Sequence, residues 1–64
     1  MRILVVGGGG REHAIIKKLK ENSEVEVIFA LPGNGGISKD AVCVDIGAKD
    51  IEGIVDFAVK NSID

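Results

Sequence analysis

Apolar residues fall in short blocks along the chain, and the spacing within each block indicates an element. Residues 2–6 form a nearly continuous apolar run bounded by glycine, typical of a strand covered on both faces in a parallel sheet. Residues 11 to about 22 are good helix formers, with apolar positions on one side and lysines elsewhere. Residues 25–30 are again apolar apart from Glu26. Together the three blocks predict a β-α-β unit.

The second half of the chain continues this alternation. Residues 31–36 are dense in turn formers, and residues 41–46 predict a third short strand. A second helix is expected from Asp50, as its N-cap, to about Asn61. Gly53 within it weakens the helix by roughly 1 kcal/mol relative to alanine, which indicates close packing against the sheet. The residues at the spacing of a buried helical stripe are Ile51, Ile54, Val55, Ala58 and Val59.

The order strand, helix, strand, strand, helix predicts an α/β, Rossmann-like fragment built on a parallel sheet. In a doubly wound sheet the first strand is central, so a further strand should pair along its free side. Residues 63–64 stop where that strand would begin. We therefore expect an N-terminal piece of a longer α/β domain, incomplete at the C-terminus.

Composition narrows the possible classes. Of 64 residues, 45% are hydrophobic and 28% are charged, as in an ordinary globular domain. A chain this short buries only about 60% of the surface exposed by its unfolded form, so a large active site is not expected within it. The net charge of −2 gives no general attraction to nucleic acid or anionic membranes. We expect a cytoplasmic protein with neither nucleic acid nor membrane as a partner.

Four consecutive glycines, Gly7–Gly10, lie where the first predicted strand ends and the first helix begins. This position can bind an anion, because a helix N-terminus presents free N–H groups and the positive end of the helix dipole. Each glycine lowers the stability of the fold by about 0.4 to 1 kcal/mol relative to a residue with less conformational freedom in the unfolded chain. The run therefore indicates either required positive φ angles or a ligand that approaches the backbone closely.

The glycine run matches neither of two common nucleotide-binding loops. A Walker loop needs Gly-Lys followed by Ser or Thr, and the chain has no Gly-Lys pair. In the dinucleotide fingerprint the third small residue would fall on Glu12 or His13. The second strand should also end in an acid, where this chain has Leu31-Pro32. A Rossmann-type nucleotide-binding module of an oxidoreductase or sensor is kept as the alternative function.

A second loop, at residues 32–36, follows the second strand. It should converge with the glycine loop outside the carboxyl ends of the strands, where open α/β sheets bind ligands. Backbone N–H groups of Gly9, Gly10 and Arg11 would suit one phosphate monoester. The side-chain amide of Asn34 would then be available to a sugar hydroxyl, and a plain turn is the alternative for this loop.

The remaining reactive side chains have simpler structural interpretations. Cys43 lies in an apolar strand pattern, so we expect a small hydrophobe rather than a reactive thiol. His13 is the only histidine, which excludes a histidine cluster for a metal, and packing or hydrogen bonding is expected there over general base catalysis. The lysines of the first helix are expected to form a solvated face, with attraction of an anionic ligand as the alternative.

Two charged residues at the start of the first helix have more than one possible role. Arg11 suits either a charge-assisted contact to phosphate or a pair with a carboxylate from another domain. Glu12 suits the helix dipole, an interaction typically worth ~0.3 to 1 kcal/mol without any ligand. Beside a phosphate site its other role would be to accept from a sugar hydroxyl or a substrate amine.

Three stretches, in register with these elements, carry a resemblance to a known family. They read G-G-G-R-E-H-A at residues 8–14, P-G-N-G-G at 32–36, and D-I-E with D-F-A at 50–52 and 56–58. In this combination the chain closely resembles the beginning of the phosphoribosylamine–glycine ligases, also called glycinamide ribonucleotide synthetases, of the ATP-grasp superfamily. The resemblance covers essentially all 64 residues.

The resemblance implies an ATP-dependent, ADP-forming carbon–nitrogen ligase of purine biosynthesis. Such an enzyme joins glycine to 5-phosphoribosylamine through a glycyl phosphate and yields glycinamide ribonucleotide. Residues 1–64 would then be part of the N-terminal, pre-ATP-grasp substrate-binding domain, with the ATP-grasp and C-terminal domains outside the chain. ATP and Mg²⁺, or Mn²⁺, would bind those domains, so no cofactor and no catalysis are expected from this chain alone.

The resemblance also implies a set of substrate-binding residues, without catalytic residues or metal ligands in this part. The partners would be phosphoribosylamine or glycinamide ribonucleotide, together with the remaining domains of the same ligase. A third possibility is a packing unit whose first strand pairs with a partner strand or a second copy. The implied substrate-binding residues are Gly8, Gly9, Gly10, Arg11, Glu12, Pro32, Gly33 and Asn34.

Overall fold

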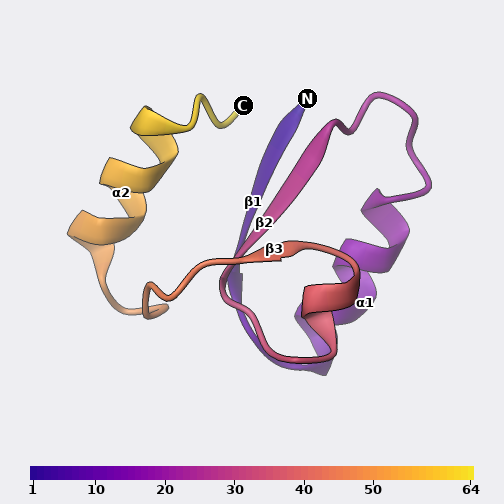
Figure 1. Ribbon diagram of the computed structural model, residues 1–64, viewed down its shortest axis with the longest axis horizontal. Coiled ribbons are helices and arrows are strands. Elements are labelled where there is room, and N and C mark those ends of the chain that lie inside the picture. The colour runs from indigo at the N-terminus through magenta and orange to yellow at the C-terminus, as the bar shows by residue number, and fades with distance from the viewer.

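A parallel sheet lies between two helices in the structure, a computed structural model that describes residues 1–64 (Figure 1). This confirms the predicted α/β, Rossmann-like fragment. Neither helix is long and apolar enough to cross a membrane. The elements are β1 (Arg2–Gly7), α1 (Gly10–Leu19), β2 (Val27–Pro32), the short 3₁₀ helix η1 (Ile37–Lys39), β3 (Val42–Cys43) and α2 (Ile51–Lys60).

The three strands pair in the order β1-β2-β3, and both pairings are parallel. β1 and β2 pair over their full lengths, with Gly7 of β1 opposite Pro32 of β2. Because parallel strands point the same way, the loops that follow them leave the sheet side by side. The register therefore places the two glycine-rich loops at one edge.

β3 is shorter than the strand predicted over residues 41–46. Only Val42 and Cys43 pair with β2, and the Val44 N–H donates once more to the carbonyl of Ala30, at 3.0 Å. The chain then turns, because the N–H of Ile46 donates back to the carbonyl of Val44 at 2.7 Å. The local turn competes with the sheet and ends the strand.

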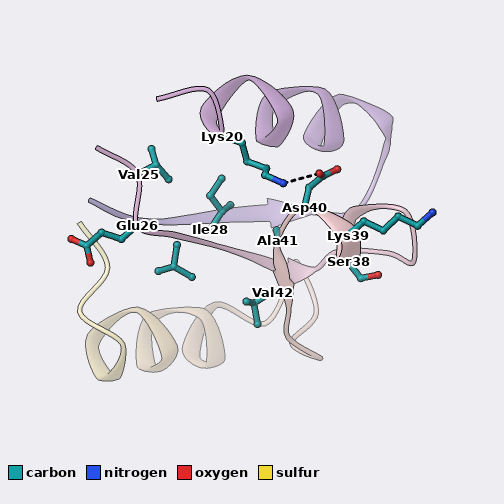
Figure 2. A pocket seen from close by; sticks show the side chains of 10 residues that line it. Lys20, Val25, Glu26, Ile28, Ser38, Lys39, Asp40, Ala41 and Val42 are labelled. Carbon is teal, nitrogen blue, oxygen red and sulfur yellow. Dashed lines mark hydrogen bonds and ion pairs between the residues drawn. The ribbon is translucent and has the colours of Figure 1, made fainter. Parts of the chain in front are cut away.

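The main core lies between α1, η1 and one face of the sheet. Its members are Ile16, Ile28, Ala30 and Ile37. Ile37 is completely buried although no element was predicted around it, because η1 folds over the sheet beside α1. Figure 2 shows α1 above the sheet and α2 below it, in the colours of Figure 1, so the two helices cover opposite faces.

α2 begins after Asp50 and ends at Lys60, as predicted, but its apolar stripe is not buried as a whole. The helix rests on the sheet through Phe57, whose ring meets that of Phe29 edge-on with centroids 5.0 Å apart. This contact turns the predicted stripe partly away from the sheet. The three exposed members are Ile51 at 73%, Val55 at 56% and Val59 at 75%.

Gly53 was expected to pack closely against the sheet, and that expectation is wrong. A Cβ atom at this position would lie 2.5 Å from Oδ2 of Asp50. The Oδ1 atom of Asp50 accepts a hydrogen bond from the Gly53 N–H at 3.0 Å and caps the helix. The glycine therefore makes room for the N-cap carboxylate.

The residues after α2 return to the outer edge of β1. The Asp64 N–H donates to the carbonyl of Arg2 at 2.8 Å, and the Arg2 N–H donates to Oδ2 of Asp64 at 2.6 Å. The Arg2 side chain donates to the carbonyl of Asn61 and stacks over Phe29, 5.6 Å from the ring centroid. Arg2 thereby joins the end of α2 to the sheet.

We predict that Asp50→Ala lowers the free energy of unfolding by about 1 kcal/mol, because the Gly53 N–H loses its cap. Urea denaturation followed by circular dichroism measures the change. Asp45→Ala is the matched control, since Asp45 is exposed on the preceding loop. Equal losses in the two variants would contradict a capping role.

Candidate functional site

The two glycine-rich loops touch each other at the carboxyl edge of the sheet, as the sequence predicts. The Gly33 N–H donates to the carbonyl of Gly7 at 3.0 Å. A Cβ atom on Gly8 would lie 2.6 Å from the carbonyl oxygen of Gly33, and Gly7 has a φ of +131°. Close approach and positive φ therefore account for the first two glycines of the run.

Asn34 joins the second loop to the first. Its Nδ2 atom donates to the carbonyl of Gly8, and its Oδ1 atom accepts from the Ile37 N–H at 2.8 Å. The side-chain amide was expected to be available to a sugar hydroxyl. In the structure each of its polar atoms makes one hydrogen bond to a backbone group, which leaves one N–H and one lone pair of the exposed amide.

Glu12 folds back over the glycine loop. Its Oε2 atom accepts a hydrogen bond from the Gly9 N–H at 3.1 Å, so the carboxylate caps the first turn of α1. This confirms the stabilising role expected from the helix dipole. The Gly9 N–H, expected to face a phosphate, is paired with Glu12 in this structure.

The next backbone N–H groups of α1 have no acceptor within the chain. The helical hydrogen bonds begin with the His13 N–H, which donates to the carbonyl of Gly9 at 3.1 Å. The N–H groups of Gly10, Arg11 and Glu12 precede it and are left unpaired, as at any helix start. The Arg11 side chain is exposed and makes no ion pair.

Gly10 differs from the glycines before it. A Cβ atom there would meet nothing within 4 Å, and its φ is ordinary. The fold therefore does not need glycine at this position, although it begins α1 beside the free N–H groups. Neither positive φ nor close packing within the chain therefore explains Gly10.

A cluster of charged residues ties α1 to the end of the second loop. Two α1 residues and the C-cap residue of α1, spaced at i, i+4 and i+7, converge on Asp40, whose side chain is 16% exposed. His13 Nε2 lies 2.7 Å, Lys20 Nζ 3.0 Å and Lys17 Nζ 3.4 Å from its carboxylate oxygens. The hydrogen bond to His13, with those to Lys20 and Lys17, holds the pKa of Asp40 well below its usual range.

This cluster confirms a hydrogen-bonding role for His13, and the lysines are exposed as expected while they also form ion pairs. Lys17 and Lys20 both pair with Asp40, whereas Lys18 pairs along the helix with Glu21 at 3.5 Å. Asp40 was not singled out in the sequence. The only signal was basic residues at helical spacing, which does not identify an acid 20 positions away in the chain.

Cys43 packs as a small side chain against the second loop. It is half-buried in β3, and its Sγ atom lies 3.5 Å from the carbonyl of Asn34. A Cβ atom on Gly33, where φ is +69°, would lie 2.4 Å from that sulfur. The thiol therefore supports the loop from below.

The main cleft of the molecule lies away from this edge. Its volume is about 390 Å³, and it runs beside the start of β2, between Lys20 and residues 38–42 (Figure 2). None of the predicted site residues lines it. The candidate site is a shallow surface at the carboxyl ends of β1 and β2, equipped with backbone donors and one guanidinium.

The family model for the N domain of phosphoribosylglycinamide synthetase matches residues 1–64. The chain belongs to this family. It is 53% identical over its whole length to a phosphoribosylamine–glycine ligase of Caldanaerobacter subterraneus subsp. tengcongensis, and 45% identical to one of Clostridium acetobutylicum. A Streptococcus suis ligase is 47% identical over 98% of the chain.

The chain spans only 15% of the length of each of these three relatives. The family match nevertheless covers every residue of both loops in this N domain. It does not support the alternative of an oxidoreductase or sensor module.

We predict that Gly10→Ala stabilises the N domain by about 0.4 to 1 kcal/mol, because alanine restricts the unfolded chain and its methyl group meets no atom. Gly8→Ala should destabilise it, since the new Cβ would collide with the Gly33 carbonyl. Urea denaturation compares the two. Gly47→Ala, also free of neighbours within 4 Å, is the control and should behave like Gly10→Ala. A destabilised Gly10→Ala variant would contradict this assignment.

We predict that Asp40→Asn lowers the free energy of unfolding at neutral pH. The difference between wild type and variant should become smaller in acid. The native pKa of Asp40 is lowered, so its ionised form stabilises the fold fully above the unfolded pKa of about 3.9. That contribution is lost as the pH falls through the native pKa.

Urea denaturation of wild type and Asp40→Asn at a series of pH values measures this difference. Asp56→Asn is the control, because Asp56 is exposed and pairs only with Lys60, at 3.0 Å. A difference that does not narrow at acid pH would show that the Asp40 charge is not responsible.

Proposed function

We propose that this N domain holds the phosphorylated sugar substrate of an ATP-dependent, ADP-forming ligase. The ligase would join glycine to 5-phosphoribosylamine and form glycinamide ribonucleotide in purine biosynthesis in the cytoplasm. The names of the relatives and the family match over residues 1–64 support this reaction. The other domains of the same ligase would be the chain's partners.

The observation that carries the proposal is the pair of free N–H groups at Gly10 and Arg11. They lie at the positive end of α1, and the Arg11 guanidinium is attached to the same turn. A 5′-phosphate can accept from both amides and pair with the guanidinium. Glu12 already occupies the neighbouring Gly9 N–H, which directs the phosphate toward Gly10.

The second loop and Glu12 would bind the rest of the substrate. With the phosphate on Gly10 and Arg11, the sugar would extend along Gly8 toward Pro32 and Gly33, which lie directly across from the glycine loop. The Glu12 carboxylate keeps lone pairs that can accept from a ribose hydroxyl or from the substrate amine. Such a donor would offset the unfavourable placement of an acid beside a phosphate.

ATP and Mg²⁺, or Mn²⁺, would be held by the other domains, where ATP would activate glycine as glycyl phosphate. The residues of this N domain do not suit a metal ion, because no three His, Cys, Asp or Glu side chains gather to hold one. Its contribution would be to bind and orient the sugar phosphate. The chain by itself is not expected to catalyse the reaction.

The binding test is an amide NMR titration of the chain with ribose 5-phosphate. We expect selective shifts at Gly8 to Glu12 and at Gly33 and Asn34, with the largest at Gly10 and Arg11. Arg11→Ala should weaken binding roughly 10-fold, as expected for loss of one charge-assisted contact. Lys49→Ala, which removes an exposed cation from the loop before α2, is the matched control.

Parallel titrations distinguish the alternatives. Shifts at the same amides with NAD but not with ribose 5-phosphate would replace the proposal by a nucleotide-binding module. Line broadening along residues 2–6 that grows with protein concentration, without any response to ligand, would replace it by a self-association unit.

A further inference from the structure

One peptide group of the glycine loop is held at both ends by side chains. The carbonyl of Gly8 accepts from Nδ2 of Asn34, and the N–H of Gly9, in the same peptide plane, donates to Oε2 of Glu12 at 3.1 Å. A peptide group is planar, so these two bonds fix its rotation about the chain axis. No other peptide of the loop is held from both sides by side chains.

The fixed peptide determines where the free amides point. The following peptide has its Gly9 carbonyl bonded to the His13 N–H at 3.1 Å, and its Gly10 N–H therefore points the opposite way, out of the helix start. Rotation of the Gly8–Gly9 peptide would move the N-cap and with it the Gly10 N–H. The hydrogen bond to the Gly8 carbonyl therefore affects the direction in which the free N–H groups point.

The Asn34 side chain connects the Gly8 carbonyl to a residue of the core. Its Oδ1 atom accepts from the N–H of Ile37, a residue that is completely buried. The turn between them is closed by the Ser38 hydroxyl, which donates to the carbonyl of Gly35 at 2.6 Å. The Asn34 side chain therefore ties the glycine loop to η1. Glycines have few conformational restraints of their own, so the loop depends on this bond for its orientation.

We propose that Asn34 is a positioning residue for the sugar phosphate: it orients the Gly8–Gly9 peptide and, through it, the Gly10 and Arg11 amides, and does not contact the substrate. This rests on the proposed function of the site. These two bonds use one N–H and one lone pair of the amide. Because the amides that they orient are those proposed to bind the phosphate, the phosphate is the substrate part affected by Asn34.

The test compares Asn34→Ala with wild type in amide NMR titrations with inorganic phosphate and with ribose 5-phosphate. A positioning role predicts that the affinities for both ligands fall by the same factor. We expect roughly 5-fold, the equivalent of one lost hydrogen bond. Weakening of ribose 5-phosphate alone would show a direct sugar contact and overturn the proposal, as would unchanged affinity for both. Asn22→Ala is the control, because Asn22 makes a comparable turn bond to the Glu24 N–H at 2.9 Å, away from the site.

A second variant keeps the test decisive if Asn34→Ala does not fold. In Asn34→Asp the ionised carboxylate can accept from Ile37 but cannot donate to Gly8, whereas the protonated carboxyl can do both. The amide shifts of Gly9 and Gly10 should therefore move away from wild type at neutral pH and return toward it below about pH 4. Shifts that stay at wild-type values throughout would overturn the positioning role.

The two proposals fail separately. If wild type binds neither phosphate nor ribose 5-phosphate, the proposed function of the site is wrong. Hydrogen exchange then still decides the role of Asn34 in the loop. Faster exchange of the Gly9 N–H in Asn34→Ala supports it, and an unchanged rate overturns it.

Discussion

The parallel register of β1 and β2 is the constraint on which the rest of the site depends. Gly7 lies opposite Pro32, so the two strands end at the same level and their loops must cross the same edge. There is no space between them for side chains, since a Cβ on Gly8 would strike the Gly33 carbonyl. Glycine is needed at position 8 because two backbones are in direct contact there.

A loop of glycines has little preference for one conformation, and the structure supplies the missing restraint from outside. Glu12 restrains the loop from the helix side and Asn34 from the side of the second loop. Further along, Asp40 joins the end of the second loop to α1 through His13 and two lysines, and its pKa is held well below its usual range. Loop and helix therefore behave as one unit, which is what orientation of an anion by backbone amides requires.

Much of the fold was predictable because it follows from local patterns. The apolar run of β1, the helical spacing of α2 and the Asp50 cap depend on neighbours within a few residues, and all three were confirmed. The predicted length of β3 was wrong, because a competing hydrogen bond from Ile46 to Val44 left no pattern in the sequence. The burial of α2 was also overestimated, since periodicity defines an apolar face without telling how far that face is covered.

The amino-acid sequence by itself determined the α/β class, the place of the glycine loop before a helix, and the family to which the chain belongs, because these depend on residue order alone. Tertiary structure decided which donors are free. Gly9, Gly10 and Arg11 were indistinguishable as candidates until the Glu12 carboxylate was found on Gly9. Whether a polar atom is available to a ligand depends on which partner the fold brings to it, and for Asn34 that partner is a carbonyl 26 positions away in the chain.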